Sequence, residues 1–141
     1  MKLSDMINGS GQNLLRVIHY PPIQDKDTSE GSIRAGAHTD INLITLLIAE
    51  PGLQVIDSSG SWVDVELPKN SIVINIGDML QEASDGFYKS TTHRVVNPKI
   101  DNNNSRYSMP LFIHPRDEVR LSNRFTAKEY LEKRLKAIGL K

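Results

Sequence analysis

The sequence predicts an all-β core that is followed by one C-terminal helix. About eight short apolar stretches of strand length, separated by turn residues, occupy most of the chain. The last part of the chain differs, because its apolar residues recur at the spacing of a helix. Many short strands with frequent turns are typical of a β-sandwich or a β-barrel.

The composition allows one domain of ordinary size and gives the chain no net charge. The chain has 141 residues, of which 38% are hydrophobic, with 17 Lys and Arg residues against 17 Asp and Glu residues. This balance does not indicate a nucleic-acid or anionic membrane partner. No apolar run approaches membrane-spanning length, and the absence of cysteine excludes disulfides and thiolate metal sites. We therefore expect a cytoplasmic protein with neither nucleic-acid nor membrane partners.

We divide the chain into three parts. Residues 1–13 are polar, contain glycine and show little periodicity, so we expect a frayed lead-in. Residues 14–115 contain the strand candidates and form the expected β core. Residues 116–141 form the C-terminal helix region.

The strand candidates follow from alternating or continuous apolar runs. Leu14–Tyr20 alternates and ends at two prolines, which cannot continue a hydrogen-bonded ladder. Leu43–Ala49 is continuously apolar, which predicts a strand buried on both faces. The other candidates are Ile33–Asp40, Leu53–Ile56, Trp62–Val65, Ile72–Ile76, Thr91–Val96 and Arg106–Ile113.

Two segments carry helix signals. Gly77–Ala83 has room for one or two helical turns, with Asp78 as the expected cap. The sequence from Thr126 to Glu129 is a capping box that opens the C-terminal helix, and Gly139 is its expected stop. The apolar face of this helix consists of Leu131, Leu135 and Ile138. We expect the helix to pack on the core.

The most informative residues for function are His38 and Asp40, one residue apart in a strand candidate. Alternate side chains of a strand share a face, so both ligand atoms can take adjacent positions around a metal ion. His93, in a later strand candidate, is the candidate third ligand. Two histidines and one carboxylate form the facial triad of non-haem Fe(II) oxygenases. A His-x-Asp pair alone is weak evidence, because such a pair more often lies in a solvated turn.

A second pair, Arg106 and Ser108, alternates in the same way at the start of an apolar strand candidate. A guanidinium binds a carboxylate through two parallel hydrogen bonds, and a hydroxyl beside it can add a third. The pair therefore suits the far carboxylate of a dicarboxylic keto acid whose other end chelates a metal ion.

Together, these motifs resemble the 2-oxoglutarate/Fe(II)-dependent dioxygenase superfamily, most closely its isopenicillin N synthase-like branch. Further segments match this branch in the same order. They are Leu15-Arg16, Tyr20-Pro21-Pro22, Pro51-Gly52-Leu53-Gln54-Val55, Trp62-Val63-Asp64-Val65, Asn75-Ile76-Gly77-Asp78-Met79-Leu80 and Thr92-His93-Arg94-Val95. The resemblance extends from about Gly9 to about Pro115.

The resemblance implies a double-stranded β-helix, which is a jelly-roll variant. It also implies that His38, Asp40 and His93 hold Fe(II), and that 2-oxoglutarate chelates this iron as the co-substrate. The implied enzyme is a dioxygenase that uses O₂ to couple oxidative decarboxylation of 2-oxoglutarate to oxidation of a small organic substrate.

For the co-substrate, the resemblance implies that Arg106 and Ser108 bind the far carboxylate and that Tyr20 lies beside it. The chain has Ile18 where many relatives have asparagine, which weakens the match around Tyr20. A tyrosine that packs under the sheet with its hydroxyl satisfied is an equal interpretation.

Two alternatives remain open. The same branch contains oxidases that use no 2-oxoglutarate, in which Arg106 and Ser108 hold the carboxylate of the substrate itself. Family members also carry a sizeable amino-terminal region that this chain lacks, so the chain could be a non-catalytic remnant or a fragment. In that case we expect self-association or a complementing amino-terminal fragment.

Overall fold

The computed structural model describes residues 2–9, 12–24, 33–48, 51–68, 70–97 and 103–140. In chain order the elements are α1 (Leu3–Ile7), β1 (Leu14–Leu15), β2 (Ile18–Tyr20), β3 (Ala35–His38), β4 (Ile44–Ile48), β5 (Leu53–Ile56), β6 (Trp62–Asp64), β7 (Ile72–Ile76), α2 (Asp78–Ala83), β8 (His93–Val95), β9 (Arg106–Ser108), β10 (Leu111–Ile113) and α3 (Ala127–Ala137). The predicted all-β core with a C-terminal helix is confirmed. The charged segment Gln24–Gly31 is predicted from the sequence to be a loop, and of this segment only Gln24 belongs to the described residues.

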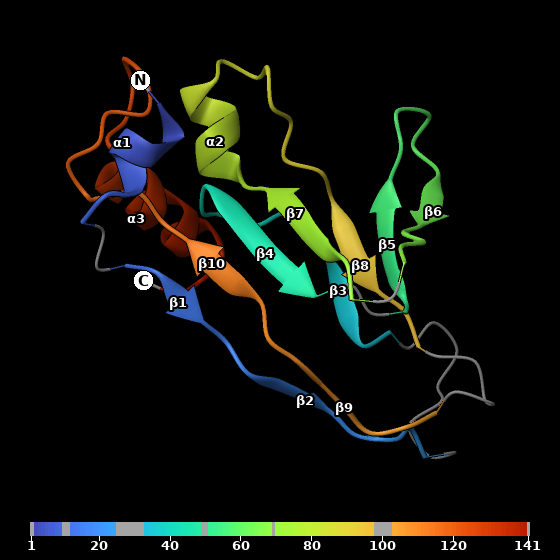
Figure 1. Ribbon diagram of the computed structural model, residues 1–141. Helices are drawn as coiled ribbons and strands as arrows, with labels where there is room; N and C mark the ends of the chain where they lie inside the picture. Colours follow the sequence, from blue (N-terminus) through green and yellow to red (C-terminus); the bar gives the residue numbers. More distant parts are fainter. Residues whose placement is uncertain are drawn as a thin grey trace.

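The strands form two antiparallel sheets and a ribbon. One four-stranded sheet has the order β1-β10-β4-β7, and the other has the order β3-β8-β5-β6. We call them the β4 sheet and the β8 sheet. Strands β2 and β9 pair with each other as the β2–β9 ribbon. In Figure 1, the three helices gather at one end of the molecule, and the β5–β6 hairpin lies at the opposite side.

Two segments that were predicted as single strands are each divided in two. Leu14–Tyr20 forms β1 in the β4 sheet and β2 in the ribbon, and Arg106–Ile113 forms β9 and β10 in the same way. The interruption falls at Pro110, which has no backbone N–H to donate. Its carbonyl oxygen instead accepts a hydrogen bond from the backbone N–H of Arg16, at 3.0 Å. Both long segments therefore bend at the same level and pass together from sheet to ribbon (Figure 1).

The prediction of a frayed lead-in is wrong for residues 3–7. Residues 3–7 form α1, and Met6 is buried in the core with 4% of its surface exposed. Arg116 holds this helix, because its guanidinium donates to the carbonyl oxygens of Asp5 at 2.8 Å and Asn8 at 2.6 Å. The sequence signal was weak because one helical turn places only one fully buried apolar side chain on the core.

The buried core lies between the helices and the segment that enters β4. Its buried members are Met6, Leu43, Met79, Val119, Leu121 and Ala127. Helix α3 is capped as predicted: the hydroxyl of Thr126 accepts from the backbone N–H of Glu129, and Gly139 follows its end at φ 76°. Among the described residues, no helix has the length and hydropathy that a membrane crossing requires.

One face of the β4 sheet is apolar and largely open, which corrects the prediction that the Leu43–Ala49 strand is buried on both faces. Cross-strand partners share a face, so the register aligns these residues on one side. We call this side the outer apolar face, and it consists of Leu15, Ile44, Leu46, Ile48, Ile72, Ile74, Ile76, Leu111 and Ile113. Ile72 is 64% exposed, Ile74 59% and Ile48 51%.

Candidate metal centre and its pocket

The three predicted metal ligands meet on the β8 sheet and the turn that follows β3. His38 and His93 are cross-strand partners on β3 and β8, and their rings lie 4.3 Å apart between centroids. The Oδ1 atom of Asp40 lies 3.9 Å from Nε2 of His38 and 3.8 Å from Nε2 of His93. All three ligand atoms lie within 4.8 Å of one another.

Backbone carbonyl groups fix the orientation of both imidazole rings. Nδ1 of His38 lies 2.7 Å from the carbonyl oxygen of Gly36, and Nδ1 of His93 lies 3.1 Å from that of Thr91. A carbonyl oxygen can only accept, so Nδ1 carries the proton in each ring. In the neutral ring Nε2 is then the unprotonated nitrogen, and it lies near Oδ1 of Asp40 in both residues.

The carboxylate of Asp40 is oriented by Thr45 of β4. The Thr45 hydroxyl donates to Oδ2 at 2.7 Å, which leaves Oδ1 for the two histidines. The side chain of Asp40 is only 6% exposed, and no arginine or lysine of the described chain forms an ion pair with it. A buried carboxylate needs a positive partner, and a bound cation would provide one.

The donor set fits a divalent transition metal ion. Oδ1 of Asp40 lies 3.9 and 3.8 Å from the two Nε2 atoms, and all three ligand atoms lie within 4.8 Å of one another, so small side-chain movements would bring them to about 2 Å from one ion. Two imidazoles and one carboxylate on a single side form the facial arrangement preferred by non-haem Fe(II), with positions left open for other ligands. The 48% exposure of the His38 side chain shows that this side is accessible.

The turn that carries Asp40 is connected to the helical core through Asp78. The prediction that Asp78 caps α2 is wrong, because Gly77 is the N-cap residue and Asp78 is the first helical residue. The carboxylate of Asp78 accepts from the hydroxyl of Thr39 at 3.2 Å and pairs with Arg134 of α3 at 3.0 Å. The backbone N–H of Asp78 also donates to the carbonyl oxygen of Asp40 at 2.7 Å.

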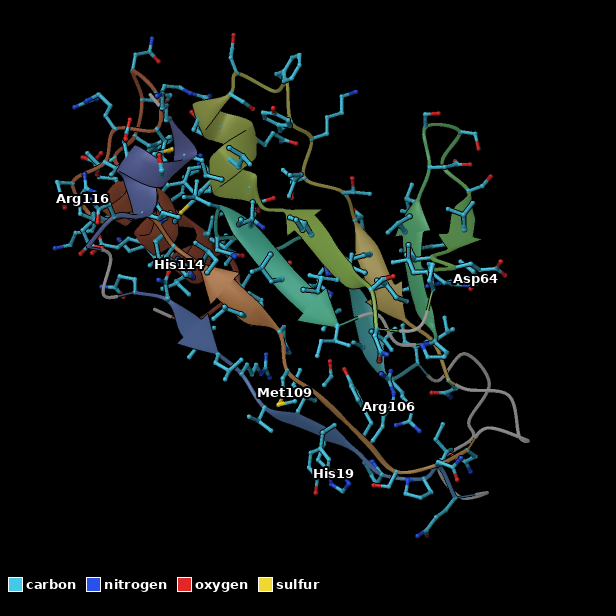
Figure 2. All side chains as sticks on the ribbon, viewed as in Figure 1. His19, Asp64, Arg106, Met109, His114 and Arg116 are labelled. Atoms are coloured by element: carbon cyan, nitrogen blue, oxygen red, sulfur yellow. The ribbon has the colours of Figure 1, made fainter. Side chains whose placement is uncertain are left out.

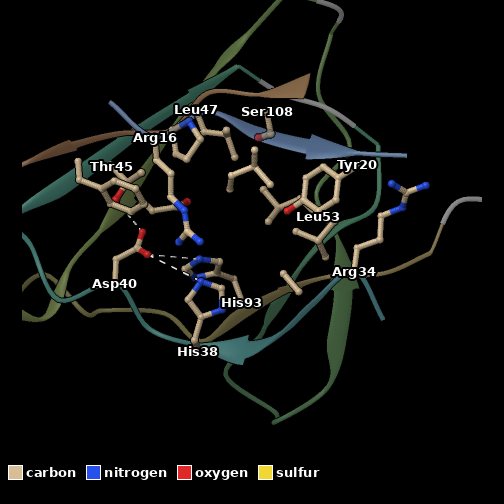
Figure 3. A pocket seen from close by; sticks show the side chains of 16 residues that line it. Arg16, Tyr20, Arg34, His38, Asp40, Thr45, Leu47, Leu53, His93 and Ser108 are labelled. Atoms are coloured by element: carbon tan, nitrogen blue, oxygen red, sulfur yellow. Dashed lines mark hydrogen bonds and ion pairs between the residues drawn. The ribbon is translucent and has the colours of Figure 1, made fainter. Parts of the chain in front are cut away.

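A cavity of about 240 Å³ opens beside the metal ligands, between the β4 and β8 sheets and the ribbon. Figure 3 shows its lining side chains converging on one space, with His38, Asp40 and His93 on one side of it. The lining residues are Arg16, Ile18, Tyr20, Arg34, Ala35, His38, Asp40, Thr45, Leu47, Leu53, Asn75, His93, Val95, Ser108, Pro110 and Phe112.

The structure brings the second predicted pair close to this cavity. Arg106 and Ser108 are both half-buried, whereas Tyr107 between them is 61% exposed, so the pair shares the inner face of β9. Ser108 and Tyr20 line the cavity. Arg106 does not line it, but its guanidinium carbon lies 4.8 Å from the centre of the Tyr20 ring. In Figure 2, Arg106 points to the inner side of the ribbon and His19 to the outer side.

Three site residues were not identified as such from the sequence: Arg16, Arg34 and Thr45. Arg34 also lies over the Tyr20 ring, at 5.3 Å, and burial together with the charge of Arg106 lowers the pKa of its guanidinium. Its Nε and Nη2 atoms are buried and have no hydrogen-bond partner among the described residues. Thr45 had a detectable signal, because it is the one polar residue in the apolar run Leu43–Ala49.

Two other histidines and one arginine lie away from the ligands. His19 is exposed, stacks on Tyr107 and contacts the Ser105 hydroxyl at 2.8 Å. Arg94 points away from His93, donates to Gln54 at 2.8 Å and stacks over Trp62. Burial lowers the pKa of His114, which hydrogen-bonds through its backbone N–H to Asn13.

The sequence of this chain matches the family model of the 2OG-Fe(II) oxygenase superfamily over residues 11–115. The chain belongs to this superfamily. Both metal-ligand segments and the strand β9 fall within the matched region of this oxygenase-family chain. The match is to the superfamily, and the isopenicillin N synthase-like branch stays a prediction.

Solved structures and curated relatives agree with this assignment. A candidate oxygenase from Shewanella oneidensis superposes with a TM-score of 0.88 at 52% identity, over 100% of this chain and 53% of that one. A Neurospora crassa protein solved in complex with alpha-KG, which is 2-oxoglutarate, superposes with a TM-score of 0.81 at 32% identity, over 96% and 47%. The 2-oxoglutarate-dependent dioxygenase citB of Monascus ruber is 40% identical over 111 residues, 76% of this chain and 33% of that protein.

These comparisons confirm the predicted double-stranded β-helix, because the superposed structures are oxygenases of this fold. They also show that the chain spans about half the length of the solved relatives and about a third of the curated one.

Proposed function

We propose that this protein is an Fe(II)- and 2-oxoglutarate-dependent oxygenase that acts on a small organic substrate. The observation that carries the proposal is the convergence of two correctly oriented imidazoles and one buried carboxylate beside a cavity, in a chain of this superfamily. His38, Asp40 and His93 are the proposed ligands. Bound Fe(II) and 2-oxoglutarate would supply the activation of O₂, with release of succinate and CO₂.

The residues of the ribbon are proposed to hold and orient the co-substrate. Arg106 offers a guanidinium fork to the far carboxylate, and Ser108 adds a hydroxyl on the same face. Tyr20 lines the cavity and its ring lies beside the Arg106 guanidinium, so its hydroxyl can reach the same group. The apolar lining side chains would limit the water beside these charge-assisted contacts and so strengthen them.

Replacement of the single anionic ligand tests this function. The Asp40→Ala variant leaves two neutral imidazoles, a poor site for a hard divalent ion, so we expect loss of stoichiometric Fe(II) binding in anaerobic titration. Succinate release from 2-oxoglutarate should disappear with it. Equal iron affinity in the wild-type protein and the variant would refute the assignment of the three ligands.

The outer apolar face supports a proposal about partners. Three of its isoleucines are more than half exposed, and contiguous apolar surface of this kind usually contacts another protein surface. We propose that the face is covered in the working protein, either by a second copy of the chain or by a complementing segment. The cytoplasmic location expected from the sequence stays a prediction.

A further inference from the structure

Arg16 places a guanidinium in the cavity that neither the proposed metal site nor the proposed co-substrate site requires. In Figure 3, its side chain extends from the connection between β1 and β2 toward the side where His38, Asp40 and His93 converge. Within the described part of the chain, no hydrogen bond or ion pair engages this guanidinium. The group is therefore available to a ligand.

The backbone sets the direction of this side chain. The Arg16 N–H donates to the carbonyl oxygen of Pro110 at 3.0 Å, at the level where both long segments bend. On either side, β1 is paired with β10 and β2 with β9. Arg16 lines the cavity although the residue as a whole is exposed, and the neighbouring Val17 is 62% exposed.

The charges around the cavity favour an anionic ligand in addition to 2-oxoglutarate. Divalent iron and the dianionic co-substrate offset one another. Among the described residues that line the cavity or contact Tyr20, Asp40 is the one carboxylate, whereas Arg16, Arg34 and Arg106 each carry a guanidinium. Asp40 offsets one of these charges, so a positive excess remains after iron and 2-oxoglutarate have bound.

The remaining cavity surface is apolar and the space is small. Side chains on the β4 sheet, the β8 sheet and β2 provide most of this surface: Ile18, Leu47, Leu53, Val95 and Phe112. A volume of about 240 Å³ lies below the usual range of drug-sized ligand pockets. The ligand that shares this space with the co-substrate must therefore be compact.

We propose that the primary substrate is a small carboxylic acid with an apolar body, whose carboxylate is bound by Arg16. The inference rests on the proposed oxygenase function. A carboxylate accepts two parallel hydrogen bonds from a guanidinium, and the apolar part then packs on the cavity walls. Because Arg16 points toward the metal ligands, an acid that it binds has its oxidisable carbons close to the proposed metal site. Arg16 is therefore a specificity-determining residue.

The binding of matched acids and amides tests this proposal, and the measurement requires no catalytic turnover. Ligand-observed NMR on the metal-free protein measures binding of phenylacetate against phenylacetamide and of hexanoate against hexanamide. We expect each acid to bind at least tenfold more tightly than its amide. The Arg16→Gln variant should lose this preference, Arg16→Lys should retain part of it, and Arg120→Gln, an exposed charge-matched control, should retain it fully.

A second titration separates the acid site from the co-substrate site. With Zn(II) as a redox-inert metal, 2-oxoglutarate should bind Arg16→Gln with an affinity within twofold of the wild-type value. Equal binding of acids and amides, or a preference that survives in Arg16→Gln, would overturn the proposal, as would a tenfold loss of 2-oxoglutarate affinity. Failure of the wild-type protein to bind Zn(II) and 2-oxoglutarate would instead refute the proposed function.

Discussion

The hydroxyl of Thr45 determines which oxygen of Asp40 faces the two imidazoles. Without this hydroxyl, Oδ2 is buried with no donor and the carboxylate can rotate. We expect Thr45→Val, a substitution of nearly equal volume, to weaken divalent metal binding by about 10- to 100-fold. Zn(II) titration with a competing chelator measures the change. The control is Thr45→Ser, which keeps the hydroxyl, and a Thr45→Val affinity equal to that of the wild-type protein would contradict the role of this contact.

Replacement of Arg106 distinguishes a 2-oxoglutarate-dependent oxygenase from an oxidase that uses no 2-oxoglutarate. If it holds the far carboxylate of 2-oxoglutarate, Arg106→Ala loses a charge-assisted contact that typically contributes about 2–5 kcal/mol, while iron affinity changes little. Calorimetric titration of the Zn(II)-loaded wild-type protein and variant with 2-oxoglutarate measures this loss of binding free energy. Unchanged affinity would favour the oxidase alternative, in which Arg106 binds the substrate. Succinate release by the wild-type protein then gives a second, independent answer.

At the residue scale, the sequence predicted the three candidate ligands that the structure brings together, and it missed the groups that orient them. His38 and Asp40 share a strand-like spacing, and Arg106 and Ser108 repeat it, so both pairs are visible along the chain. Thr45 acts only because β4 passes beside the turn that carries Asp40. Contacts between elements of this kind depend on the tertiary arrangement, which periodicity does not contain.

At the scale of elements, helix α3 stabilises the turn that carries Asp40, and it does so through a residue of α2. Arg134 pairs with Asp78, whose side chain is only 10% exposed, and Asp78 bonds to Thr39 and to the Asp40 backbone. Arg134→Met leaves a mostly buried carboxylate unpaired, so we expect a loss of about 1–3 kcal/mol in unfolding free energy. Urea unfolding measures it. In a double-mutant cycle with Asp78→Asn, the two losses should not add.

A second contact between α2 and the C-terminal region predicts a pH dependence. The Ser122 hydroxyl and the Arg124 guanidinium lower the pKa of Glu82. A group whose pKa is lower in the folded state stabilises the fold above its unfolded pKa, and this stabilisation is lost as the pH falls through the folded pKa. From about pH 6 to about pH 3.5, Glu82→Gln should therefore lose less stability than the wild-type protein, by on the order of 0.5 kcal/mol.

Thermal melting at both pH values provides this comparison. Glu66→Gln is the matched control, because Glu66 is an exposed glutamate. A Glu82→Gln variant whose melting temperature follows pH as steeply as that of the control would contradict the contribution of Glu82.

At the scale of the whole molecule, the outer apolar face predicts association. Ile74 lies on β7 within this face and is 59% exposed. We expect the wild-type chain to self-associate at micromolar concentrations, and Ile74→Lys to shift it toward the monomer, since a charge within the contact is costly to bury. Size-exclusion chromatography with light scattering measures the mass. Val63→Lys, an exposed position on β6, should change nothing, and a monomeric wild-type chain would refute the expectation.

The global arrangement was the least accessible part of the fold from sequence. The period-two patterns predicted most strands, and the capping box predicted α3, because both signals are local. The division of Leu14–Tyr20 between a sheet and the ribbon had no local signal, since the proline that causes the bend is Pro110 on the partner strand. The burial of α1 likewise depends on Arg116, far along the chain.

The pairing of the first strands with the last ones also affects how fast the site can form. Leu14 pairs with Phe112 and Tyr20 with Arg106, so the contacts that close the cavity join residues near opposite ends of the chain. Closing loops of this length costs entropy that local hairpins such as β5–β6 do not pay, and contacts of long sequence separation slow folding. The cavity walls supplied by β2 and β10 should therefore assemble late. A chain caught before that step would have a formed β5–β6 hairpin but no complete site for a substrate.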